Sequence, residues 1–86
     1  MNEFSDVFDQ VVEQIDARGL LCPEPLVRCR KVLDVLEEGE RVHVLATDPH
    51  AEIDFEVFTK RSGHLLLASQ WQNEVLHVLI ARRASG

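Results

Sequence analysis

Two prolines within four residues mark the place where this chain changes from an extended segment to a helix. The run reads Cys22-Pro23-Glu24-Pro25. A residue that precedes proline is disfavoured in the helical region of backbone space, whereas proline itself suits the first turn of a helix. We therefore expect Cys22 to be the N-cap of a helix, with an extended segment before it.

The hydrophobic pattern on both sides of this run predicts two strands and the first helix. Residues 11–16 suit a short strand, and residues 41–47 alternate and are β-branched, as is typical of another. Between them, residues 26–38 predict a helix that Gly39 ends. Its apolar stripe consists of Leu26, Cys29, Val32, Leu33 and Leu36.

The second half of the chain predicts one more helix and a hairpin. Asp48 and Pro49 suit the N-cap and first position of a helix that reaches Ser62 and ends at Gly63. The expected core residues of this helix are Ile53, Val57 and Phe58. Residues 64–71 and 74–82 predict two strands joined by a tight turn at residues 72–73, which makes them an antiparallel hairpin.

The predicted order βαβαββ defines the expected fold class. We expect an α+β fold, namely a two-layer α/β sandwich with two helices on one face of a mixed four-stranded sheet. A chain of 86 residues supports one domain. We assign residues 11–86 to that domain and residues 1–10, which carry three acidic groups and no basic one, to an acidic N-terminal tail.

Charge is distributed unevenly along the chain. The net charge is −6, which argues against broad binding of a phosphate backbone, so no direct nucleic-acid partner is expected. Residues 18–31 nevertheless carry +3, so the remainder carries −9. The charged residues of this basic island are Arg18, Arg28, Arg30 and Lys31, with Glu24 as the one acidic member. A basic surrounding favours a reactive thiolate.

Cys22 is the strongest candidate for a functional side chain. At a helix start, free N–H groups and the helix dipole favour an anion, which predicts a pKa below the ~8.5 of a free thiol. Pro23 and Pro25 lack N–H groups and Glu24 adds negative charge, so these neighbours oppose the effect, and Arg18, Arg28 or Arg30 is the candidate to offset them. The motif therefore predicts a rigidly presented thiol more than a strongly acidic one. The alternative is that Cys22 is an ordinary small residue at a helix start.

The remaining cysteine and the histidines do not suggest a second site. Cys29 lies on the apolar stripe, and a helical rise of ~10 Å separates it from Cys22, so we expect it in the core. The chain has no Cys-x-x-Cys pair, and its four histidines lack ligand spacing, so no metal is predicted. Val75, His77 and Leu79 are expected on the helix-free face of the sheet, which would suit partner docking or dimerisation.

The chain resembles the TusA/SirA family of small sulfur carriers, which share a Cys-Pro-x-Pro motif at the start of the first helix. The similar residues are Asp16 to Pro25, Arg30-Lys31, Gly39-Glu40, Asp48-Pro49, Asp54-Phe55 and Gly63-His64. The resemblance covers residues 13–83 and implies the same βαβαββ sandwich. Its functional residue corresponds to Cys22, and Pro23, Glu24, Pro25, Arg18 and Arg30 form the expected motif and thiol environment.

This resemblance also implies a function and partners. Cys22 is expected to accept sulfur as a persulfide from a cysteine desulfurase or a rhodanese-like donor. It then passes the sulfur to an acceptor protein, for tRNA thiolation, molybdenum-enzyme maturation or related sulfur metabolism. The activity is that of a sulfurtransferase-type carrier rather than a stand-alone multi-turnover enzyme, and needs no cofactor. The absence of a long apolar run or a secretory signal, and the low cysteine content, predict a cytoplasmic protein without membrane contact. We expect a monomer or a weak dimer.

Two other functions remain open from the sequence. The first is a non-catalytic regulatory or interaction module of the same fold, in which Cys22 is structural. The second is a redox-sensing thiol, which is disfavoured because no resolving cysteine lies within reach.

Overall fold

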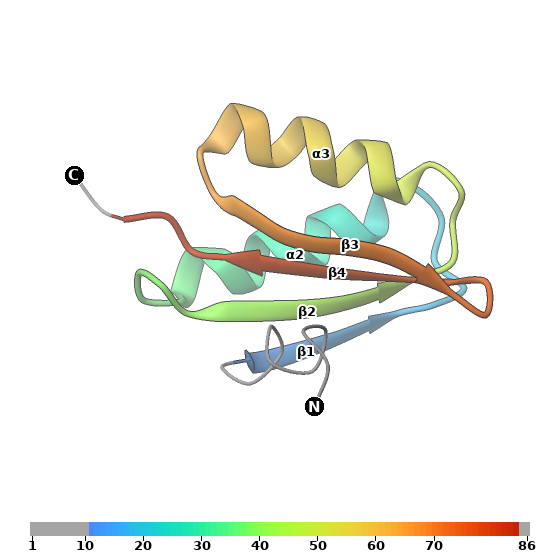
Figure 1. Cartoon of the computed structure of the whole chain (residues 1–86), viewed down its shortest axis with the longest axis horizontal. Coiled ribbons are helices and arrows are strands. Elements are labelled where there is room, and N and C mark those ends of the chain that lie inside the picture. Colours follow the sequence, from blue (N-terminus) through green and yellow to red (C-terminus); the bar gives the residue numbers. More distant parts are fainter. Residues whose placement is uncertain (1–10, 85–86) are drawn as a thin grey trace.

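The computed structural model describes residues 11–84, so the predicted acidic tail lies outside the described residues. The order of elements is the predicted βαβαββ (Figure 1). Their bounds are β1 Val11–Ala17, α2 Glu24–Val35, β2 Arg41–Ala46, α3 Ala51–Ser62, β3 Leu65–Gln72 and β4 Val75–Ala81. The predicted α+β sandwich is therefore confirmed.

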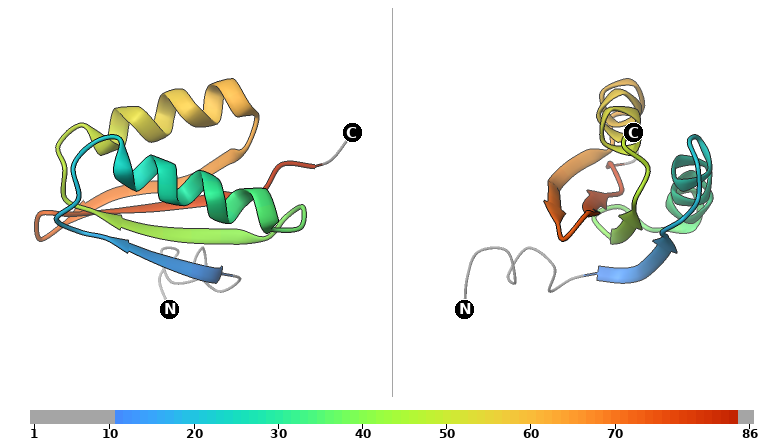
Figure 2. Two further views of the ribbon diagram at one scale, coloured as in Figure 1. Left: turned by 180° about the vertical axis from the view of Figure 1, so that it is seen from behind. Right: turned by 90° about the vertical axis from the view of Figure 1, so that its right-hand side faces the viewer.

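The four strands form one mixed sheet in the order β1-β2-β4-β3. β1 and β2 are parallel and are joined through α2, whereas β4 pairs antiparallel with both β2 and β3. Both helices cover the same face of the sheet, as the end-on view in Figure 2 shows. This arrangement places the turn after β1 and the turn after β2 at the same end of the molecule.

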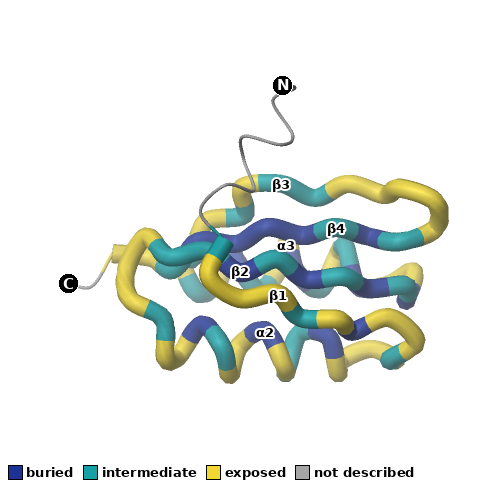
Figure 3. Tube along the Cα trace, turned by 90° about the horizontal axis from the view of Figure 1, so that it is seen from below, coloured by how far each residue is buried: buried dark blue, intermediate teal, exposed yellow. Residues whose placement is uncertain are grey.

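The core lies between the sheet and the two helices. Alternate residues of the central strands face it and are fully buried, namely Val42 and Val44 of β2 and Leu76, Val78 and Ile80 of β4. In Figure 3 these two strands are the most buried part of the sheet, and the edge strands β1 and β3 are more exposed. Cys29 and Leu33 of α2 complete the core from above, so the expected core position of Cys29 is confirmed.

The second helix begins later than the sequence predicts. Pro49 and His50 form a turn, and the N-cap is His50 rather than Asp48. The Asp48 carboxylate accepts a hydrogen bond from the backbone N–H of His50 at 2.7 Å, and this bond stabilises the turn that precedes the helix. The helix then ends at Gly63, whose φ of 83° suits a residue without a side chain.

The buried face of α3 also differs from the predicted one. The core residues are Ala51, Phe55 and Thr59, an i, i+4, i+8 stripe, and the Thr59 hydroxyl is satisfied by the Phe55 carbonyl at 2.9 Å. Ile53 and Val57, which we expected in the core, are 58% and 43% exposed. Phe58 is partly buried against the core. The predicted core of this helix is therefore wrong at two of its three positions.

The helix-free sheet face also differs from the expectation. Leu79, predicted to be available there for docking, is fully buried, and it pairs with His43 on β2 and Ala68 on β3. His77 stacks on His43, with ring centroids 5.1 Å apart. Leu79 is therefore not available on the apolar surface that was predicted for docking.

Candidate functional site

Cys22 lies in the turn that connects β1 to α2 and is exposed. The turn is closed by a hydrogen bond from the Glu24 N–H to the Leu21 carbonyl at 2.9 Å, and the Cys22–Pro23 peptide bond is cis. The N-cap of α2 is Pro23, so Cys22 lies one residue before the position predicted for it. Among the described residues, no side chain caps this end of the helix with a hydrogen bond.

The thiol of Cys22 is held by a residue of the other helix. Its Sγ donates a hydrogen bond to Oδ2 of Asp54, in the first turn of α3, at 2.6 Å. The Cys22 backbone N–H donates to Oδ2 of Asp48 at 2.9 Å. Asp48 itself is nearly buried, and its other oxygen accepts the N–H of His50. Asp48 thus joins the turn before α2 to the turn before α3, and Asp54 joins Cys22 to α3 itself.

The electrostatic setting of Cys22 is opposite to the one predicted. The hydrogen bond to Asp54 raises the pKa of the Cys22 thiol above its ordinary value, and partial burial and the charges of Asp54 and Asp48 act in the same direction. The predicted lowering is therefore wrong. The physical reason is tertiary, because Asp54 of α3 and Asp48 of the loop before α3 lie against the turn of Cys22, and both are distant from Cys22 in the sequence.

The three arginines of the island contact groups other than the thiol. Arg18 forms an ion pair with Asp16 at 2.8 Å, and Arg28 lies 3.9 Å from Glu24. The guanidinium of Arg30 lies over the ring of Phe58, 5.9 Å from its centroid. The structure brings Pro23, Glu24 and Pro25 together around Cys22 at the start of α2. Arg18 and Arg30 instead have partners other than the thiol.

Asp48 and Asp54 are the site residues that analysis of the motif missed. They lie 26 and 32 residues from Cys22 along the chain. Each belongs to a dipeptide that resembles the family pattern, Asp48-Pro49 and Asp54-Phe55. That resemblance was the available signal, but it gives no contact. Only the packing of α3 beside α2 places these carboxylates at the cysteine.

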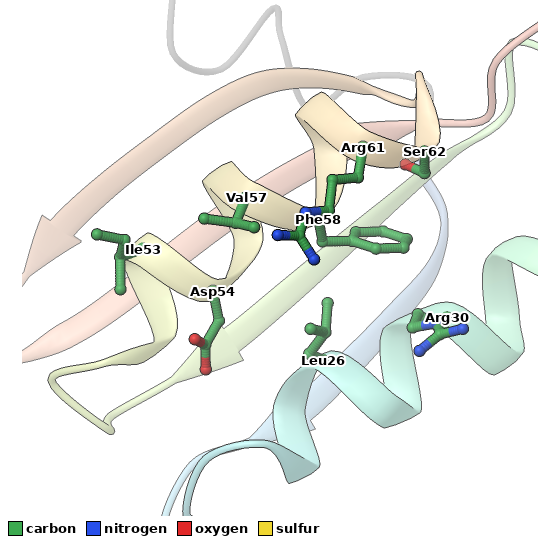
Figure 4. A pocket seen from close by; sticks show the side chains of 8 residues that line it. All are labelled: Leu26, Arg30, Ile53, Asp54, Val57, Phe58, Arg61 and Ser62. Atoms are coloured by element: carbon green, nitrogen blue, oxygen red, sulfur yellow. The ribbon is translucent and has the colours of Figure 1, made fainter.

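An open groove of about 450 Å³ runs between α2 and α3 beside this cluster (Figure 4). Two of its side chains come from α2 and the others from α3. The groove is lined by Leu26, Arg30, Ile53, Asp54, Val57, Phe58, Arg61 and Ser62. Asp54 belongs to both the groove and the thiol contact, so the exposed sulfur borders an apolar groove with arginines in its lining.

The described part of the chain contains neither a candidate metal site nor a helix that could span a membrane. Within residues 11–84 no group of three or more His, Cys, Asp or Glu side chains is arranged to hold a metal ion. His43 and His77 form a pair with ring nitrogens 2.9 Å apart, on the sheet and not at the cysteine. No helix among these residues is long and apolar enough to cross a membrane.

Comparison with known proteins gives consistent matches over nearly the whole domain. The family model described as sulfurtransferase TusA matches residues 13–82. The sulfur carrier protein TusA of Allochromatium vinosum is 40% identical over 75 residues, which cover 87% of this chain and 95% of that protein. The putative sulfur carrier protein YrkI of Bacillus subtilis is 38% identical over 68 residues, covering 79% and 91% of the two chains.

A solved structure has the same fold. The crystal structure of a SirA-like protein from Desulfitobacterium hafniense superposes with a TM-score of 0.73 at 27% identity. The match covers 83% of this chain and 97% of that one. The sequence and structural matches therefore agree on one family.

Proposed function

The chain belongs to the TusA family of sulfurtransferases, and we propose that it is a sulfur carrier that holds sulfur as a persulfide on Cys22. The observation that carries this proposal is the exposed thiol of Cys22 in a turn before α2, in a chain whose other cysteine is fully buried. A carrier must offer its sulfur to other proteins, so one exposed thiol at an edge of the molecule suits the task.

The buried cysteine supports a single working thiol. Burial raises the pKa of the Cys29 thiol to about 12, so this group stays protonated and unreactive in the folded protein. No metal or organic cofactor enters the proposed chemistry, because sulfur transfer between thiols is an exchange reaction that depends on thiolate content and access.

We further propose that sulfur arrives from a cysteine desulfurase or a rhodanese-like protein and leaves to an acceptor protein. The acceptor pathway is tRNA thiolation, molybdenum-enzyme maturation or related sulfur metabolism. The groove between α2 and α3 supports a role in docking, because its apolar side chains Ile53 and Val57 are exposed beside the cysteine. Two free thiols suit a reducing compartment, and we place the carrier in the cytoplasm.

The test of carriage is persulfide formation on Cys22. The protein is incubated with cysteine and a desulfurase, and its intact mass is measured before and after reduction. We expect a one-sulfur increment that reductant removes, and no increment on Cys22→Ser. Absence of the increment with desulfurase and rhodanese-type donors would leave a non-catalytic interaction module as the function, in which Cys22→Ala retains partner binding.

Docking in the groove is tested by placing a charge in it. Val57→Lys should slow sulfur transfer from a donor protein, because a lysine in the apolar groove opposes close contact with a partner. Val35→Lys is the matched control, since Val35 is 81% exposed at the end of α2, outside the groove. Loading of Cys22 by a small-molecule persulfide should be the same in both variants and the wild type. Equal protein-to-protein rates in both variants would place the partner elsewhere.

A further inference from the structure

The contact between Cys22 and Asp54 specifies the protonation state of the sulfur. An ionised carboxylate only accepts hydrogen bonds, so the proton in the 2.6 Å contact between Sγ and Oδ2 comes from the thiol. Asp54 reaches the cysteine from the first turn of α3, across the boundary between the two helices. This is a contact that only a neutral, unmodified Cys22 can make.

The charge around this contact is negative. Asp48 is the second carboxylate, fixed by the N–H groups of Cys22 and His50, and it adds to the rise in the thiol pKa. His50 lies 3.4 Å from Asp48, with its side chain 77% exposed. Of the nearby arginines, Arg18, Arg28 and Arg30 have other partners, whereas Arg61 lines the groove together with Asp54. Glu24 begins α2 with a further negative charge. These arginine pairs are Arg18 with Asp16, Arg28 with Glu24 and Arg30 with the Phe58 ring.

We propose that Asp54 interacts differently with the empty and the loaded carrier. Its carboxylate accepts a hydrogen bond from the neutral Cys22 thiol and repels the Cys22 persulfide anion. This inference deepens the proposed function and rests on it. A persulfide is a stronger acid than the parent thiol, so loaded Cys22 is an anion at neutral pH and has no proton to donate. The terminal sulfur therefore leaves Asp54 and extends toward solvent, where an acceptor protein can reach it.

The loading step can be written in full. Empty Cys22 gives up its proton, and its sulfur attacks the outer sulfur of a donor persulfide, R–S–SH. A new S–S bond forms on Cys22 while the donor S–S bond breaks, and the donor sulfur leaves with the electron pair and takes up the proton. R–S–SH and Cys22–SH thus become R–SH and Cys22–S–SH, and the new persulfide then loses its proton to solvent at neutral pH. The Cys22 sulfur is oxidised by the amount that the inner donor sulfur is reduced.

The charge of Asp54 has opposite effects on the reactant and the product of this reaction. It stabilises the reactant, because the neutral thiol donates to a carboxylate, and it destabilises the ionised product through charge repulsion. Asp54 thereby shifts the loading equilibrium toward the empty carrier. A carrier that binds sulfur less tightly passes it on more readily, which is the property that a relay between two proteins needs.

The first test measures the empty form without any sulfur donor. The rate of Cys22 alkylation by iodoacetamide is followed by intact mass as a function of pH, while buried Cys29 stays unlabelled. Asp54→Asn keeps an acceptor of the same shape and removes the charge, and Asp54→Ala removes both. We expect both to move the alkylation midpoint to lower pH, and a midpoint lower by about one pH unit means about tenfold more thiolate at neutral pH. The control is Glu56→Gln, an exposed carboxylate on the same helix, which should leave the midpoint unchanged.

The second test measures the loaded form. Wild type and variants are equilibrated at pH 7.5 with a mixture of glutathione persulfide and glutathione, and the loaded fraction is read by mass. The ratio of loaded to empty carrier should rise several-fold in Asp54→Asn and stay at the wild-type value in Glu56→Gln. An alkylation midpoint or a loaded ratio that is unchanged in both Asp54 variants would overturn the inference.

These outcomes are separable from failure of the proposed function. If desulfurase and rhodanese donors fail to load wild-type Cys22, carriage is wrong, yet the alkylation profile still reports whether Asp54 controls the thiol. If donors load Cys22 and the Asp54 variants behave as wild type, the protein is a carrier in which Asp54 has no such role. The Ala variant guards against an Asn side chain that retains the hydrogen bond.

Discussion

Asp48 stabilises the turn that presents Cys22 by accepting two backbone hydrogen bonds through one carboxylate. The N–H of Cys22 donates to one oxygen and the N–H of His50 to the other. These bonds, that of Cys22 first, lower the pKa of Asp48 below its ordinary value. At the scale of single residues, the position of Cys22 therefore depends on a side chain 26 positions away.

This lowered pKa predicts a pH dependence of stability. A carboxyl whose pKa is lower in the folded state binds protons more tightly when unfolded. Its stabilisation is therefore present above about pH 4, the unfolded pKa of Asp, and is lost as the pH falls through the folded value. Urea midpoints between pH 6 and pH 3 should fall more steeply for wild type than for Asp48→Asn. Glu13→Gln, on exposed β1, should follow the wild type, and parallel curves for all three would contradict the role of Asp48.

At the scale of elements, α3 has one face that is buried on the sheet and another that lines the groove. The stripe of Ala51, Phe55 and Thr59 is buried on the sheet, whereas Ile53 and Val57 line the open groove. Asp54 lies between these stripes and reaches Cys22. The buried stripe differs from the predicted one, so apolar side chains remain exposed on the groove side of the helix.

Stability measurements on α3 should separate its two faces. Phe55→Ala removes a fully buried ring and should cost about 3–5 kcal/mol of unfolding free energy, through lost burial and the cavity left behind. Ile53→Ala changes a side chain that is 58% exposed and should stay within about 0.5 kcal/mol of wild type. Urea unfolding measures both. A large cost for Ile53→Ala would indicate that the predicted core, with Ile53 inside, is the correct one.

At the scale of the whole molecule, the sheet separates the sulfur site from a histidine pair. The helices and the cysteine lie on one side, and His43 and His77 stack on the sheet, with Gln14 of β1 3.2 Å from His43. Burial, together with the charge of His77, lowers the pKa of His43. This pair links the central strands β2 and β4 by a contact that protonation disturbs.

The histidine pair predicts that the fold weakens in mild acid. Since the folded pKa of His43 is lowered, its stabilising effect is complete above the unfolded value of about 6.5 and is lost as the pH falls toward the folded value. We expect the thermal midpoint of the wild type to fall between pH 7.5 and pH 5.5. His43→Gln should lose less over the same interval, and an equal loss in both proteins would exclude His43 as the cause. His64, whose pKa is also lowered, accounts for a residual fall.

The sequence by itself determined the element order, the sheet-and-helix class and the core position of Cys29, and it predicted Cys22 as the functional residue. Each depends on local signals, namely alternation in strands, a helical stripe in α2 and prolines at a helix start. Only the tertiary structure decided which stripe of α3 is buried, because both stripes carry apolar side chains and the packing of the helix on the sheet selects one. It also decided the electrostatic setting of Cys22, since Asp54 meets the sulfur and Asp48 accepts the backbone N–H of Cys22 only in the folded chain. Local sequence places a thiol, but its electrostatic setting comes from groups distant along the chain.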